Sequence, residues 1–97
     1  MIRSFADPGT EDVFHGRNTR QARGACPAAL GAVAARKLDQ LDSAHALRDL
    51  RHPPGNRLER LRGDRAGQYS LRLNERYRVC FLWTDAGPEK VQIVDYH

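Results

Sequence analysis

A proline-rich break near the middle of the chain separates two parts with different periodicities. The break is His52-Pro53-Pro54-Gly55-Asn56. Each proline removes a backbone donor and restricts the residue before it, so a helix is expected to stop there. Before the break, apolar residues recur at helical spacing, and after it they alternate with polar residues as in strands. We therefore predict helices in the first part and a sheet in the second.

The strongest helical pattern begins at Pro27. Leucine, valine and alanine recur from there at spacings of three and four as far as Leu41, and alanine fills much of the remainder. The pattern fades near Ser43, which is expected to cap a further short turn over residues 44–50.

A shorter helix is predicted near the N-terminus. Asp7-Pro8 is typical of a helix cap followed by a proline in the first turn. This helix is expected to carry Val13 and Phe14 inward and to end near Gly16. Two flanking segments complete this part, an opening strand at residues 2–5 and a polar, basic loop at residues 17–24.

The part after the break alternates between apolar and polar residues. We predict strands at residues 68–74, 76–83 and 91–96, with turns at 74–75 and 84–89. Tyr69, Tyr77 and Trp83 fall on the apolar faces and are expected in the core. Leu58 and Leu61 are three apart, so residues 57–62 are expected to form a strand that bends into the Gly63-Asp64 turn.

This order of elements predicts an α+β fold. We expect an antiparallel-dominated sheet of about four or five strands, with two to three helices packed on one face. The length of 97 residues favours a single domain, residues 1–97. No segment has the pattern of a signal peptide or a membrane span, so a cytoplasmic protein without membrane contact is expected. Cys26 and Cys80 have no metal-ligand spacing, so we expect buried thiols and no metal or other cofactor.

The positive charge of the chain is concentrated in one stretch. Residues 57–78 hold seven arginines and three carboxylates, a formal charge of +4, which equals that of the whole chain. Arginine binds phosphate in bidentate fashion and stacks on bases, so this stretch is consistent with nucleic-acid contact. The alternative is an ordinary solvated surface in an arginine-rich protein.

Four separated segments resemble the HigB subgroup of RelE/ParE toxins. They are Met1-Ile-Arg-Ser-Phe5, Asn56-Arg-Leu-Glu-Arg-Leu-Arg-Gly-Asp-Arg65, Arg76-Tyr-Arg-Val-Cys-Phe81 and Asp95-Tyr-His97. The resemblance implies a RelE/ParE-like fold with a basic active surface on the sheet. It further implies a toxin of a type II toxin–antitoxin system that cleaves messenger RNA on the ribosome without a metal. The implied partner is a HigA-type helix-turn-helix antitoxin, and operator DNA would be bound only through the complex with it.

The resemblance also implies site residues. Asp95, Tyr96 and His97 match the catalytic ending of the family, while Arg62 and Arg78 match positions that contact phosphate. We expect His97 to act as the general acid, with a pKa raised by Asp95 and the terminal carboxylate. Tyr96 is expected to stack on or orient a base. Weaker contacts with RNA phosphates are expected from a second set of basic residues, Arg60, Arg65, Arg72 and Arg76.

One position departs from the family pattern. Several relatives have His-Pro-Leu-Lys-Gly-Asp-Arg where this chain has Glu59-Arg-Leu-Arg-Gly-Asp-Arg65. Glu59 or Asp95 is expected to serve as the general base, and the alternative for Glu59 is a salt bridge with a neighbouring arginine. Two other functions also stay open. One is a ParE-like inhibitor of DNA gyrase, and the other is a catalytically impaired module that binds only its antitoxin or RNA.

Overall fold

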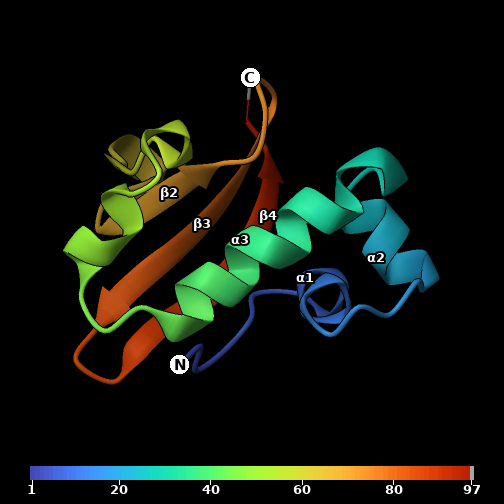
Figure 1. Ribbon diagram of the computed structural model, residues 1–97, viewed down its shortest axis with the longest axis horizontal. Helices are drawn as coiled ribbons and strands as arrows, with labels where there is room; N and C mark the ends of the chain where they lie inside the picture. Colours follow the sequence, from blue (N-terminus) through green and yellow to red (C-terminus); the bar gives the residue numbers. More distant parts are fainter. Residues whose placement is uncertain (97) are drawn as a thin grey trace.

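The computed structural model describes residues 1–96 and contains a four-stranded sheet with helices on one of its faces (Figure 1). The α-helices are α1 (Pro8–Phe14), α2 (Arg20–Ala25) and α3 (Gly31–Ser43). Short 3-10 helices are η1 (Ala28–Leu30), η2 (Leu47–Arg51), η3 (Pro54–Asn56) and η4 (Gly63–Arg65). The strands are β1 (Glu59–Arg60), β2 (Gln68–Arg72), β3 (Tyr77–Thr84) and β4 (Gly87–Asp95). The predicted α+β class is confirmed.

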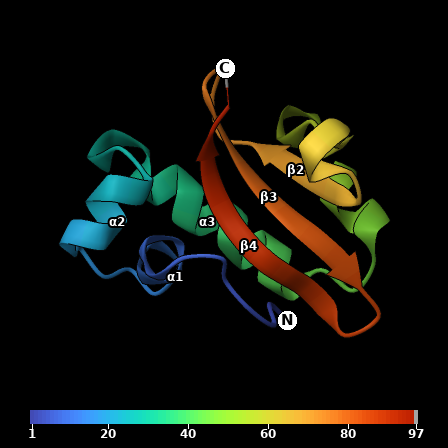
Figure 2. The same ribbon diagram turned by 180° about the vertical axis from the view of Figure 1, so that it is seen from behind.

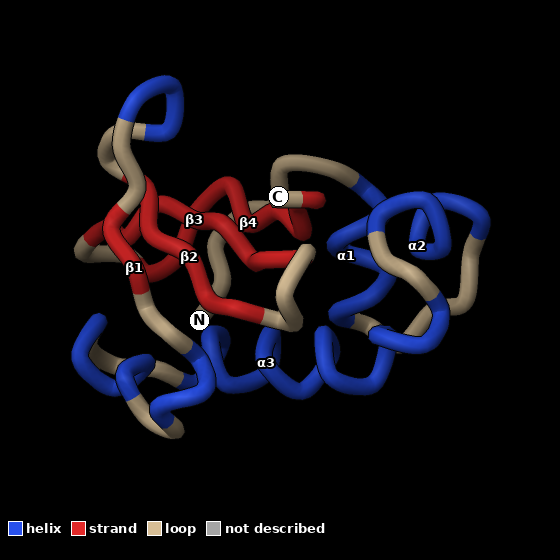
Figure 3. Tube along the Cα trace, turned by 90° about the horizontal axis from the view of Figure 1, so that it is seen from above, coloured by secondary structure: helices blue, strands red, loops and turns tan. Residues whose placement is uncertain are grey.

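The four strands are antiparallel and follow one another in the order β1-β2-β3-β4. Helix α3 lies across one face, and the view from behind leaves β3 and β4 uncovered (Figure 2). Seen from above, α3 and the sheet form two layers (Figure 3). We call the face away from α3 the open face. The predicted turn at 84–89 was too long, because Thr84 Oγ1 accepts from Ala86 N and donates to Gly87 O, which starts β4 at Gly87.

The core lies between α3 and the sheet. Ala34, Leu38 and Leu41 of α3 are fully buried, as their spacing of three and four predicts. They belong to one cluster with the buried strand residues Leu71, Val79, Phe81, Val91 and Ile93. Burial of one leucine side chain contributes about 1.5–3 kcal/mol, so this layer supplies much of the driving force for folding. Tyr69, Tyr77 and Trp83 pack against it as predicted.

The break after α3 is held by a buried side chain. Asn56 is fully buried, and its Nδ2 lies within hydrogen-bond distance of Gln40 Oε1 and of the carbonyl oxygens of Leu50 and His52. The turn expected under a Ser43 cap forms instead as η2, where Asp49 accepts from the backbone N–H groups before the helix. The proline-rich segment therefore forms an ordered corner between the helical part and the sheet.

Two expectations for the N-terminal part were wrong. Residues 17–24 do not form a loop throughout, because Thr19 caps α2 by accepting from Ala22 N, and Ala22 is buried against the core. Residues 2–5 do not form a regular strand, since their pairing in the described chain is a single isolated bridge from Phe5 to Val91, in parallel orientation. A polar segment can thus form a helix when one side chain caps it and another is buried.

The outer edge of β4 is covered by the N-terminal segment. Val91 exchanges backbone hydrogen bonds with Ser4 and Ala6, and Arg3 N donates to Pro88 O. The strand bulges at Lys90, which has a φ of 52° and donates its N–H to Ser4 Oγ. Further along, Ile93 N donates to the buried Thr10 Oγ1 of α1. The edge of β4 is therefore bound to both the N-terminal segment and α1.

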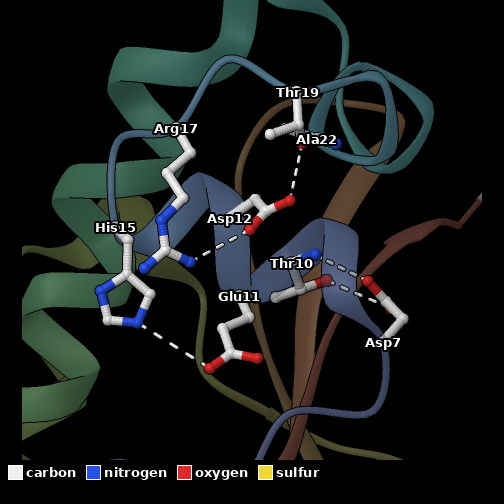
Figure 4. Close-up of polar contacts among 8 residues, drawn as sticks. All are labelled: Asp7, Thr10, Glu11, Asp12, His15, Arg17, Thr19 and Ala22. Carbon is white, nitrogen blue, oxygen red and sulfur yellow. Dashed lines mark hydrogen bonds and ion pairs between the residues drawn. The ribbon is translucent and has the colours of Figure 1, made fainter.

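Polar contacts at both ends of α1 connect it to its surroundings (Figure 4). Asp7 caps the helix by accepting from Thr10 N at 2.6 Å. Asp12 accepts from Thr19 Oγ1 at 2.6 Å and from Arg17 Nη1 at 3.3 Å, which ties α1 to the start of α2. These bonds lower the pKa of Asp12, with the Thr19 bond as the largest cause.

Gly9 permits the close approach of α1 and α2. A Cβ at this position would lie 2.4 Å from Gln21 O and 2.8 Å from Ala25 Cβ, which is a steric clash. We expect Gly9→Ala to destabilise the fold by about 1–3 kcal/mol, measured by urea unfolding. Gly24→Ala is the control, because a Cβ there meets nothing within 4 Å. Equal unfolding midpoints for the two variants would contradict this account.

The lowered pKa of Asp12 predicts a stability that depends on pH. A carboxyl with a lowered folded-state pKa stabilises the protein above its ordinary value of 3.8, and this contribution is lost as pH falls through the folded-state value. We expect Asp12→Asn to lower the free energy of unfolding at neutral pH, with the difference from wild type shrinking below about pH 4. Denaturant unfolding across pH tests this, with exposed Asp39→Asn as the control. A difference that stays constant with pH would argue against the mechanism.

Candidate functional site

The strand register determines which arginines lie on the open face. In antiparallel pairs the residues opposite each other point to the same side of the sheet. Arg78 of β3 lies opposite Arg72 of β2, and Cys80 lies opposite Ser70. The residues between them, such as Leu71 and its partner Val79, are buried in the core. Arg72 and Arg78 are thus brought together on the open face, as a shared site requires.

Arg78 is held by three neighbours. Its Nη1 donates to Ser70 Oγ at 2.8 Å, and its Nη2 donates to Glu59 Oε1 at 3.1 Å. The ring centroid of Tyr96 lies 5.9 Å from its Cζ, within the range of a cation–π contact. The Arg78 side chain is 15% exposed, whereas that of Glu59 is 54% exposed. The guanidinium is therefore fixed in place beside a solvent-accessible carboxylate.

Glu59 and Arg60 point to opposite sides of the sheet. Glu59 lies opposite Ser70, on the open face, while Arg60 lies opposite Tyr69, whose ring is stacked against Phe81 of the core. The structure therefore brings Glu59 to Arg78 but separates Arg60 from the other predicted site residues. The alternation in a strand of two residues was too short for the sequence to assign these faces.

The turn between β1 and β2 lies beside the open face. This segment, yellow in Figure 2, lies on the viewer's side of β2. Arg65 donates to Gln68 Oε1 at 3.1 Å, and Arg62 is exposed directly before η4. Arg65 and Arg78 both act on the buried Cys80 thiol, whose pKa is raised by burial and lowered less by these two charges. The charges of Arg65 and Arg78 therefore both reach Cys80 of β3.

The C-terminal strand places its last described residues on opposite faces. Asp95 lies opposite Tyr77, on the side of the helices, and accepts from Arg76 Nε at 2.9 Å and Nη2 at 2.8 Å. This bidentate pair raises the pKa of Arg76. Tyr96 N donates to Arg76 O, and its ring lies against Arg78. Alternation within the strand holds, but the residue that shares the face of Arg78 is Tyr96 and not Asp95. His97 lies outside the described residues.

Some of the predicted site residues lie at the open face, and others do not. Arg62, Arg65, Arg72, Arg78, Glu59 and Tyr96 lie at or beside the open face, whereas Arg60, Arg76 and Asp95 do not. Sequence reasoning missed Ser70, which is fully buried and holds Arg78. Its alternation with Leu71 placed it on the polar face, but only the pairing of β2 with β3 brings it to Arg78.

The open face combines a cation, a carboxylate and an aromatic ring. A fixed guanidinium binds phosphate, a neighbouring carboxylate accepts a proton, and a half-exposed phenol ring stacks on a base. Cys26 and Cys80 are buried free thiols, as predicted. Within residues 1–96, no group of three or more His, Cys, Asp and Glu side chains is placed to hold a metal ion. Nor does that part of the chain contain a helix long and apolar enough to cross a membrane.

Curated proteins match parts of this chain. Toxin HigB-1 of Vibrio cholerae serotype O1 is 54% identical over 50 residues, which cover 52% of this chain and 53% of that protein. An uncharacterized protein of Haemophilus influenzae is 42% identical over 57 residues, covering 59% of this chain and 56% of that protein. The match therefore spans about half the length of these curated relatives.

A solved structure and a family model cover nearly the whole chain. One chain in a structure of the YoeB-YefM complex from Staphylococcus aureus superimposes with a TM-score of 0.60. It shares 14% identity, over all of this chain and 98% of that one, which supports the likeness of fold. A family model described as HigB-like toxin, a RelE-like toxin of the type II toxin-antitoxin system HigB, matches residues 3–97. The chain therefore belongs to the HigB-like family of RelE-like type II toxins.

Proposed function

We propose that this toxin is an endoribonuclease that cleaves messenger RNA on the ribosome. The observation that carries the proposal is the position of Arg78, which Ser70 and Glu59 fix on the open face. A guanidinium held in this way is ready to bind a phosphate without first being ordered. Its neighbour Glu59 is exposed and so is accessible to a substrate hydroxyl.

The chemistry needs a base, an acid and a cation. The base removes the proton of the 2′-hydroxyl, and the 2′-oxygen then attacks phosphorus. The bond from phosphorus to the 5′-oxygen breaks as the acid protonates that oxygen, leaving a 2′,3′-cyclic phosphate and a 5′-hydroxyl. The cation stabilises the negative charge that builds up on the phosphate oxygens during the attack.

We assign these roles to residues as follows. Glu59 is the base and Arg78 the cation, because they lie 3.1 Å apart on the same face. Tyr96 stacks on or orients a nucleobase. His97 is assigned as the general acid because the C-terminal residues resemble the catalytic ending of the family. Additional phosphate contacts come from exposed or half-buried arginines at this face, Arg62, Arg65 and Arg72. Asp95 is a positioning residue here, since Arg76 engages both of its oxygens.

We further propose that a HigA-type helix-turn-helix antitoxin silences the toxin. The family description names a type II toxin-antitoxin system, and the Staphylococcus aureus structure with the same fold is a complex. In this scheme operator DNA is bound only by the toxin–antitoxin complex.

The proposed activity is tested by adding the purified protein to a translation reaction and mapping 5′ ends on the transcript. We expect new 5′-hydroxyl ends only when the message is being translated. Intact message together with inhibited DNA supercoiling would instead identify a gyrase inhibitor. Intact message with normal supercoiling would identify a module without catalytic activity.

The role of Glu59 as base predicts a defect in the chemical step. We expect Glu59→Gln to lower the single-turnover cleavage rate by about 10²-fold or more, because an amide cannot accept the proton. RNA binding by this variant should be unchanged or tighter, since one negative charge is lost. Asp64→Asn removes an exposed carboxylate from the adjacent turn and is the matched control. Similar rates for Glu59→Gln and the control would remove Glu59 from the mechanism.

A further inference from the structure

A second concentration of arginines lies on the other side of β1. A hollow of about 560 Å³ is formed there by η2, η3 and the start of the sheet. We call it the arginine groove, and its lining residues are Leu47, Arg48, Arg51, Pro54, Arg57, Leu58, Arg60 and Tyr69. The four arginines are exposed, and among the residues that the structure describes no carboxylate lines the groove. Within residues 1–96, none of these guanidinium groups forms an ion pair.

The groove is electrostatically unbalanced. Four like charges around one hollow repel each other, and among the described residues the lining holds no negative side chain. Asp49 lies outside the lining, and its pKa is lowered by hydrogen bonds from the backbone of Ala46 and His45 and also by the charge of Arg48, so it offsets part of the repulsion. Among the described residues three arginines outside the groove form ion pairs, Arg17 with Asp12, Arg76 with Asp95 and Arg78 with Glu59. Unpaired arginines that converge on a concave surface are suited to an anionic ligand, and arginine has the planar geometry that matches phosphate.

The backbone at Arg57 supports a binding role for this side chain. Arg57 has a φ of 44°, in the left-handed region that glycine adopts more readily than any other residue. A glycine would relieve this strain, yet the position carries an arginine that lines the groove. An arginine at this position therefore costs more local backbone energy than a glycine would.

We propose that the arginine groove binds phosphates of an RNA backbone, as an anchor outside the cleavage site. The identity of the ligand rests on the proposed function. β1 consists of two residues, and Glu59 faces the cleavage site while Arg60 faces the groove. The two sites thus lie on opposite sides of one short strand at the edge of the sheet. A small anion would occupy only one of them, whereas a polymer that passes over β1 contacts both.

The half-buried Tyr69 adds a contact for the same ligand. It is an aromatic side chain in the groove lining, and its ring is stacked on Phe81 with 6.3 Å between centroids. Single-stranded RNA is commonly bound by arginines that follow the backbone together with an aromatic ring that stacks on a base. The groove offers both kinds of contact.

The test compares two glycine substitutions that each remove one cation from a residue with positive φ. Arg57→Gly alters the groove, and Lys90→Gly alters β4 at the opposite edge of the sheet. Binding is measured by fluorescence anisotropy with a single-stranded RNA whose 2′-hydroxyls are methylated to prevent cleavage. We expect Arg57→Gly to weaken binding by roughly threefold to tenfold and to reduce the slope of log affinity against log salt by about 0.7. The melting temperature of Arg57→Gly should equal or exceed that of wild type. Weaker RNA binding by this variant would then not be caused by unfolding.

The matched control and a second variant complete the design. We expect Lys90→Gly to retain wild-type affinity and salt dependence. Arg48→Gln with Arg51→Gln leaves the Arg57 backbone unchanged and should weaken RNA binding further than Arg57→Gly. If Arg57→Gly and Lys90→Gly weaken RNA binding equally, the effect comes from net charge alone, and the proposal is overturned.

Failure of this inference and failure of the proposed function give different results. A wild-type protein that binds RNA and cleaves it, with groove variants indistinguishable from Lys90→Gly, would refute only the groove. A wild-type protein that neither binds nor cleaves RNA would refute both. Groove variants that bind RNA normally but no longer bind the antitoxin would identify a protein-docking surface and also refute the proposal.

Discussion

The register between β2 and β3 is the constraint on which the candidate site depends. It sets Ser70 opposite Cys80 and Arg72 opposite Arg78, and so directs these polar side chains away from α3. A shift of one residue would turn Arg78 into the core and expose its apolar neighbours. Leu71, Val79 and Phe81 are buried in one cluster with residues of α3, which opposes such a shift. The packing that stabilises the fold therefore also determines where the guanidinium of Arg78 lies.

Ion pairs then hold individual arginines on different sides of the sheet, which composition alone does not indicate. Asp95 holds Arg76 on the side of the helices, while Glu59 and Ser70 hold Arg78 on the open face. Exposed pairs such as Arg76 with Asp95 contribute little to stability, so their main effect is on orientation. The basic stretch of residues 57–78 is thus divided between two surfaces. One has Glu59 beside Arg78, and the other has no carboxylate in its lining among residues 1–96.

Much of the fold could be predicted from the sequence, because the spacing of apolar residues indicates which side of a helix or strand is buried. The spacing of Leu38 and Leu41 predicted α3, and the alternation around Leu71 and Val79 predicted β2 and β3. Helix α2 was missed because its sequence is polar and depends on Thr19 for its cap. The faces of Glu59 and Arg60 were not predictable, since a strand of two residues has too little alternation to assign. The hydrogen bond from Arg78 to Ser70 spans eight residues and depends on the strand pairing. His97, the expected acid, lies outside the described residues.

The two edges of the sheet have a consequence for self-association. Exposed strand edges present unpaired backbone groups that recruit strands from other molecules. Here one edge is β1, which is short and carries an acidic and a basic side chain. At the other edge, Ser4, Ala6 and Thr10 already bond to the backbone of β4. Within the part of the chain that the structure describes, neither edge offers a long free ladder, which disfavours edge-to-edge pairing of copies into extended sheets.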